Sequence, residues 1–111
     1  MLESYDEILE DDSIINVGRI RLETILTPGH TPGSMCFKVK DKPILFSGDT
    51  LFPGGPGATQ FEGGDFKKII DSIDRRLFTL DKRTAVLPGH GDNTTIGDER
   101  PHLDEWVDRG W

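Results

Sequence analysis

The chain has 111 residues, a length that suits one domain. Thirteen basic against twenty acidic residues give a net charge of −7, which argues against unaided binding to nucleic acid or to an anionic membrane. A single cysteine excludes an intramolecular disulfide framework, no apolar run approaches ~20 residues, and the N-terminus lacks a secretory signal pattern. These features predict a cytoplasmic protein without a transmembrane helix.

The first half of the chain is predicted to consist mainly of strands. Residues 2–10 show only weak helical spacing of apolar side chains. Alternating apolar positions then predict strands over residues 19–27 and 34–40. A turn at 40–43 leads into a short buried strand at 44–47. Because these three strands follow one another closely, we expect an antiparallel meander.

The second half is predicted to hold a loop, two helical regions and one more strand. Residues 51–64 are predicted to be loop because glycine and proline are frequent there. The clearest helix covers residues 66–78, with Asp65 as its N-cap. This helix is a crossover, so the short strand at 84–87 is expected to run parallel to the third strand of the meander. A last helical region spans about 95–109, with an apolar stripe of Leu103, Trp106 and Val107.

Three of the predicted strands run into a glycine that is followed by a potential metal ligand. The three sequences are Pro28-Gly29-His30, Ser47-Gly48-Asp49 and Pro88-Gly89-His90. The predicted strand directions bring all three to one edge of the sheet. Two imidazoles and a carboxylate suit zinc, and also iron or manganese. We therefore predict a metal site at His30, Asp49 and His90, although a single histidine after such a turn is more often a surface loop residue and Asp49 alone could be an N-cap or turn residue.

The sequences around these residues resemble three signatures of the metallo-β-lactamase-fold hydrolases. Residues 27–34 are similar to the third signature of that family, residues 46–52 to the fourth and residues 87–92 to the fifth. The order of the signatures and the intervening strands and helix also match. The resemblance covers nearly the whole chain and is closest to the glyoxalase II-like branch, which hydrolyses thioesters.

This resemblance implies that His30 binds a first metal, that Asp49 bridges two metals and that His90 binds the second. The complete domain would hold one or two zinc ions, with iron or manganese as alternatives, and would act on a small-molecule thioester or ester. The family's first signature supplies further ligands and the aspartate that orients the nucleophile, and nothing here matches it. No catalytic residue is therefore assigned, and Cys36 is interpreted as a small apolar filler. We expect this chain alone to bind metal weakly or not at all and to have little or no hydrolase activity.

The fold class that follows is α/β in layers, with a mixed sheet, a crossover helix and a C-terminal helix. Residues 1–111 would form a partial domain, the C-terminal half of the αββα metallo-β-lactamase sandwich. Such a half leaves an apolar sheet face uncovered, which the remainder of a longer protein or a second copy in a homodimer would cover. Two other functions stay open, namely a non-catalytic assembly or binding module and an iron-dependent persulfide dioxygenase-like enzyme. Relatives often carry an Arg and an Asp where this chain has residues 57–60, which weakens both specific enzyme labels.

Overall fold

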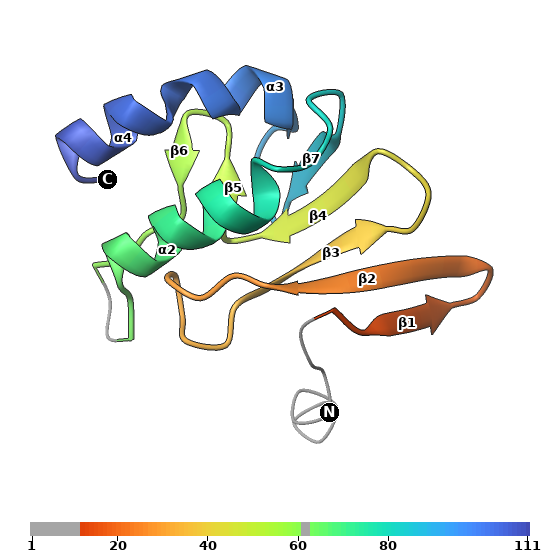
Figure 1. The fold of residues 1–111 in the computed structure, drawn as a ribbon. Coiled ribbons are helices and arrows are strands. Elements are labelled where there is room, and N and C mark those ends of the chain that lie inside the picture. Colours follow the sequence, from red (N-terminus) through yellow and green to blue (C-terminus); the bar gives the residue numbers. More distant parts are fainter. Residues whose placement is uncertain (1–11, 61–62) are drawn as a thin grey trace.

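The computed structural model describes residues 12–60 and 63–111, and the weak helix predicted over residues 2–10 lies outside this part. A mixed sheet forms the centre of the molecule (Figure 1). Its strands, in spatial order, are β1 (Ile14–Val17), β2 (Ile20–Leu26), β3 (Met35–Val39), β4 (Ile44–Gly48), β7 (Ala85–Pro88) and β8 (Thr94–Thr95). Neighbouring strands are antiparallel except for β4 and β7, which run parallel. The predicted meander and the parallel strand after the crossover are confirmed.

The predicted crossover helix is present in two parts. Asp65 caps its start, since the Asp65 side chain accepts a hydrogen bond of 3.1 Å from the Lys68 N–H. The parts are α2 (Phe66–Ser72) and a π-helical segment, η1 (Ile73–Leu77). The C-terminal helical region comprises α3 (Ile96–Glu99), a 3-10 turn η2 (Arg100–His102) and α4 (Leu103–Arg109). None of the helices in the part of the chain that the structure describes is long and apolar enough to cross a membrane.

Short strands that the sequence did not predict complete the fold. Within residues 51–64, where we predicted a loop, β5 (Leu51–Phe52) and β6 (Gly55–Pro56) pair as a small hairpin. The prediction was wrong there because strands of two residues show no alternation of polar and apolar positions. The Leu51 side chain is completely buried, so this hairpin is anchored in the core rather than lying loosely over the sheet.

One face of the sheet packs against the helices and forms the core. The register places the core side chains of β2, β3, β4 and β7 on the face that α2 covers in Figure 1. The main core residues are Ile25, Cys36, Leu45 and Val86 from the sheet, Ile69, Ile73 and Leu77 from α2 and η1, and Ile96 and Trp106 from the C-terminal region. Of the stripe predicted for the last helix, Trp106 is buried whereas Val107 is half-exposed, so α4 contacts the core along a narrower line than predicted.

The opposite face of the sheet is also apolar and is only partly covered. Phe37 pairs with Phe46 across β3 and β4 on this face, and the Phe46 side chain is 40% exposed. Ile20 lies at the β1 end of the same face and is 51% exposed. This is the face that a layered half-domain was expected to leave open.

Thr84, directly before β7, offers a test of the packing. Its side chain is completely buried, and its hydroxyl finds no hydrogen-bond partner among residues 12–60 and 63–111. Because a buried unpaired hydroxyl costs about 1–3 kcal/mol, Thr84→Val is expected to raise the free energy of unfolding by about 1 kcal/mol. Urea denaturation measures this change. Thr24→Val is the matched control and should destabilise, since the equally buried Thr24 hydroxyl accepts a 2.8 Å hydrogen bond from the Ser13 N–H. A loss of stability in Thr84→Val would contradict the prediction.

Candidate metal centre

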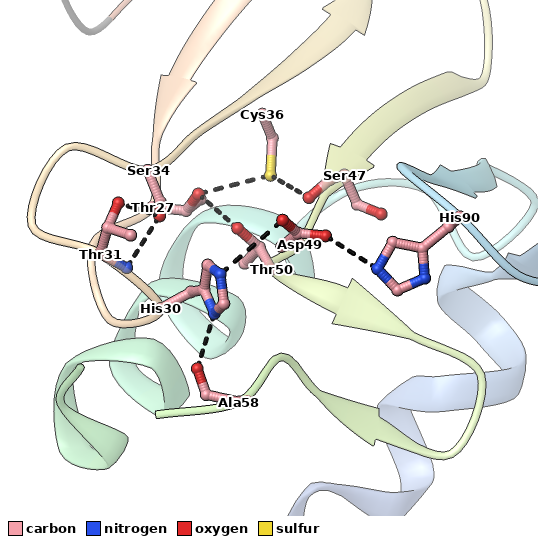
Figure 2. Close-up of polar contacts among 10 residues, drawn as sticks. All are labelled: Thr27, His30, Thr31, Ser34, Cys36, Ser47, Asp49, Thr50, Ala58 and His90. Atoms are coloured by element: carbon pink, nitrogen blue, oxygen red, sulfur yellow. Dashed lines mark hydrogen bonds and ion pairs between the residues drawn. The ribbon is translucent and has the colours of Figure 1, made fainter. Parts of the chain in front are cut away.

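The three predicted ligands lie together at one edge of the sheet, as Figure 2 shows. His30 follows β2, Asp49 follows β4 and His90 follows β7, and these three strands point the same way. The Nε2 atom of His30 lies 3.7 Å from Oδ2 of Asp49. The Nε2 atom of His90 lies 3.2 Å from the other carboxylate oxygen, Oδ1. The predicted convergence of the side chains is confirmed, and metal binding by them stays a prediction.

Backbone hydrogen bonds fix Asp49 relative to the His90 loop. Gly48 has a positive φ of 52°, and the β4–β7 register shifts at this point. The Gly89 N–H donates to the Gly48 carbonyl over 2.8 Å, which joins the two loops directly. On the other side, Gly57 lies so close that a Cβ atom there would be 1.7 Å from the Asp49 carbonyl oxygen. Asp49 is therefore held between two backbone segments that approach it closely.

Helix α2 holds the loop that carries His30. The Asp65 N–H donates to the Gly29 carbonyl over 2.7 Å, and the Ser72 hydroxyl donates to the Pro28 carbonyl over 2.8 Å. Gly29 has a φ of 145° and packs directly on Ile69 of α2. The N-terminal part of the crossover helix thus sets the height of this loop above the sheet edge.

A backbone carbonyl orients the His30 ring. Nδ1 of His30 lies 2.6 Å from the Ala58 carbonyl oxygen. That oxygen only accepts, so in the neutral ring the proton belongs on Nδ1, and Nε2, which faces Asp49, is the nitrogen available to a metal ion. Metal-binding histidines are commonly fixed in this way through their second nitrogen. His90 has looser support, since the Phe52 ring packs beside it at a tilt of 39° with centroids 5.0 Å apart, while 78% of the His90 side chain stays exposed.

The orientation of His30 can be checked without metal. The contact with Ala58 predicts that the neutral His30 ring is mainly the Nδ1–H tautomer. Long-range nitrogen–proton NMR correlations of the ring distinguish the two tautomers directly. The exposed His90, which lies 78% open to solvent, serves as the internal comparison. Finding the Nε2–H tautomer at His30 would contradict the arrangement.

The donor geometry fits one carboxylate shared by two cations. Each imidazole approaches a different oxygen of Asp49, so each ion would receive one nitrogen and one oxygen from this chain. Across the described ranges, no group of three or more His, Cys, Asp or Glu side chains is placed to hold a metal ion. Since a catalytic zinc ion usually has about three protein ligands, a complete site needs further ligands. The residues present fit part of a two-metal site.

Sequence reasoning found the three ligand candidates and missed two of their supports. The Ala58 carbonyl is a backbone group, and the residue type at position 58 says nothing about it. Phe52 lies on β5, in a segment predicted to be loop, so its approach to His90 was not foreseen. The run of glycines that allows this segment to approach the site was the only available signal.

Comparison with known families agrees with this geometry. The profile of the metallo-beta-lactamase superfamily matches residues 3–90. The chain belongs to this superfamily. Its members depend on metal ions, and the matched range includes all three predicted ligands.

Individual relatives give the same result. The chain is 44% identical over 101 residues to "Probable metallo-hydrolase YqgX" of Bacillus subtilis, covering 88% of this chain and 48% of that protein. It is 38% identical over 91 residues to "Hydroxyacylglutathione hydrolase GloC" of Haemophilus influenzae, covering 82% and 43%. It is 39% identical over 82 residues to the human mitochondrial "Persulfide dioxygenase ETHE1", covering 74% and 32%. The chain therefore spans less than half the length of these curated relatives.

Solved structures match the fold. The BLEG-1 B3 metallo-beta-lactamase superposes with a TM-score of 0.79 at 38% identity, covering 86% of this chain and 46% of that one. TTHA1623, solved in a di-iron-bound form, superposes with a TM-score of 0.73 at 36% identity, covering 83% and 44%. The mixed sheet with its crossover helix is accordingly part of a metallo-β-lactamase fold.

Proposed function

We propose that this chain supplies part of a two-metal centre that hydrolyses a small-molecule thioester or ester, as glyoxalase II-like enzymes do. In this proposal residues 1–111 are the C-terminal half of the catalytic domain. The observation that carries it is the approach of two imidazoles to opposite oxygens of one carboxylate, at 3.7 and 3.2 Å. Similarity to the hydroxyacylglutathione hydrolase GloC supports a thioester substrate. A cytoplasmic setting belongs to the same proposal, because a lone buried thiol suits a reducing compartment.

The residues of this chain have separate tasks in such a centre. His30 together with Asp49 would hold one ion, and His90 together with Asp49 would hold the other. The Asp49 carboxylate would supply negative charge to both ions and so reduce their repulsion. The Ala58 carbonyl keeps the His30 lone pair pointed inward. When bound, the metal ions would supply a Lewis acid and a nucleophilic water at neutral pH, preferably zinc, with iron or manganese as alternatives.

Access of substrate is consistent with the exposure of the site. Half of the Asp49 side chain and most of the His90 side chain are open to solvent. A centre with two ligands for each ion binds metal weakly, so we expect the isolated chain to have little hydrolase activity. The missing ligands would come from the additional length that the relatives have.

The test is to complete the domain and to measure hydrolysis. The chain is fused to the upstream half of the Bacillus subtilis relative and assayed on a hydroxyacylglutathione thioester, with and without a chelator. Activity should require metal and should fall at least ~100-fold in His90→Ala. His102→Ala is the matched control and should keep full activity, because the half-exposed His102 ring pairs with Glu105 on the helical surface. Activity that is indifferent to both the chelator and His90→Ala would refute the proposal.

A second candidate is an iron-dependent persulfide dioxygenase-like activity. The similarity to human ETHE1 and to a di-iron-bound structure favours it specifically. Metal analysis of the completed protein, purified from medium with equal zinc and iron, separates the two proposals. Iron content together with oxygen consumption on a persulfide would favour the dioxygenase, and zinc with thioester hydrolysis would favour the hydrolase.

A third candidate is a non-catalytic assembly or binding module that acts through the partly covered sheet face. The exposed Phe46 and Ile20 on that face favour it, and a homodimer would bury them. Light scattering of the chain measures the assembly state. A monomer that binds no apolar dye would exclude this candidate.

A further inference from the structure

The His30 loop and the Asp49 turn are held together by side chains beneath the site. β2 and β4 are not neighbours, because β3 lies between them in the sheet. Their ladder hydrogen bonds therefore link the loops that follow them only indirectly, through β3. Directly under the site, Oγ1 of Thr27 lies 3.0 Å from Oγ1 of Thr50 (Figure 2). Both threonines are completely buried.

The contact between these hydroxyls continues through β3 to β4. Oγ1 of Thr27 lies 3.4 Å from Sγ of Cys36, and the Cys36 thiol donates to the Ser47 carbonyl over 3.6 Å. Burial raises the pKa of the Cys36 thiol, so the thiol keeps the proton that it donates. One arrangement pairs every donor, with Thr50 donating to Thr27, Thr27 to Cys36 and Cys36 to Ser47. The chain of donors thus spans all three strands.

We propose that the Thr27–Thr50 hydroxyl pair is a positioning device that sets the spacing of His30 and Asp49 for metal binding. This proposal rests on the proposed metal function. Thr27 stands three residues before His30, and its N–H closes the base of that loop by donating to the Ser34 carbonyl over 2.8 Å. Thr50 follows Asp49 directly, and its N–H donates to the Ser47 carbonyl over 2.9 Å. A bond between the two hydroxyls therefore joins the bases of two ligand loops.

The other pair of ligands does not depend on this device. Asp49 and the His90 loop are joined by the backbone bond from Gly89 to Gly48. Loss of the hydroxyl pair should therefore disturb the His30 side of the site and leave the His90 side in place. This asymmetry distinguishes a positioning role from a general loss of packing.

The experiment titrates zinc ion alone into the 15N-labelled 111-residue chain and follows the His30 and Asp49 amide signals. Thr27→Val and Thr50→Val remove the hydroxyls while keeping the side-chain shape. Each should weaken zinc binding about 10-fold, as loss of a supporting contact commonly does. The double variant should be no weaker than Thr27→Val, because Thr27→Val already removes the bond to Thr50. Thr50→Ser should restore binding, and Thr84→Val, an equally buried threonine without a bonded hydroxyl, should bind as the parent chain does.

Spectra recorded without zinc separate this proposal from the proposed function. In Thr50→Val the His30 signals should shift without zinc, whereas those of His90 should not, and Thr84→Val should leave both unchanged. If the parent chain binds no zinc, the proposed function loses support, while these shifts still uphold the positioning role. Valine variants that bind zinc like the parent, or His30 signals that do not move, would overturn it. If a valine variant does not fold, the test is made on the parent chain instead. There, the absence of nuclear Overhauser contacts between the Thr27 and Thr50 methyl groups would overturn the proposal as well.

Discussion

Replacing Asp49 by asparagine is expected to reduce zinc binding at least ~100-fold while leaving the fold intact. Asp49 contacts both histidines, so the change removes a ligand from each of the two proposed ion positions. Asparagine keeps the shape of the side chain but not the charge that attracts the cations. In the metal-free chain the carboxylate is half-exposed, so its contacts with the imidazoles contribute at most about 1 kcal/mol to folding. Zinc titration and urea denaturation of the same variant measure the two effects separately.

Asp92→Asn is the matched control for this prediction. Asp92 lies two residues beyond His90, and its replacement by asparagine removes the same formal charge. If net charge alone attracted zinc, the two variants would lose affinity equally. An affinity that falls only in Asp49→Asn identifies the bridging carboxylate. Unchanged zinc binding in Asp49→Asn would contradict the site geometry itself.

Gly29→Ala is expected to destabilise the chain by about 3 kcal/mol or more. The backbone of Gly29 has a φ of 145°, which residues with a side chain rarely adopt, and this strain costs about 1–3 kcal/mol. A methyl group there would also lie 2.2 Å from Cβ of Ile69 and close to the Ile69 backbone. Because the obstacle is helix backbone, α2 would have to move, which adds an overpacking cost of about 1–3 kcal/mol. Thermal and urea unfolding measure the loss.

Gly33→Ala tests the same loop without the obstacle. A Cβ atom at Gly33 would meet nothing within 4 Å, and its φ lies outside the positive range. We expect a change of less than ~0.5 kcal/mol there, as for other surface substitutions. Equal destabilisation by the two variants would show that the loop responds to lost flexibility rather than to its contact with α2.

The sequence predicted those parts of the fold in which each element is long enough to show a period. The alternation over 19–27 and 34–40 located β2 and β3, and the helical spacing after Asp65 located α2. Strands of two residues, such as β5, carry no period and were missed. β1 was also missed, because polar and apolar residues do not alternate over Ile14–Val17. The segment is a strand because it pairs with β2.

In the candidate site too, some residues could be predicted from the sequence and others could not. Its candidate ligands were predictable because they are particular residue types placed after predicted strands. Its supports were not, because they depend on which segments meet in space. The Ala58 carbonyl could belong to any residue, and the Thr27–Thr50 contact requires knowing that β3 separates β2 from β4. A threonine next to a ligand is otherwise indistinguishable from a threonine that only fills space.

The single parallel pair, β4 with β7, has a consequence for the order of folding. Strands β1 to β4 form by successive short turns, so contacts between them close over small sequence separations. The pairing of Ile44 with Ala85 must instead close a loop of about 40 residues, which is entropically more costly and slower. We therefore expect the strands before His30 and Asp49 to pair early, while the His30 loop, which α2 holds, and the His90 loop take their final positions only after the crossover has docked. The coming together of the three candidate ligands would then report that this long-range pairing has formed.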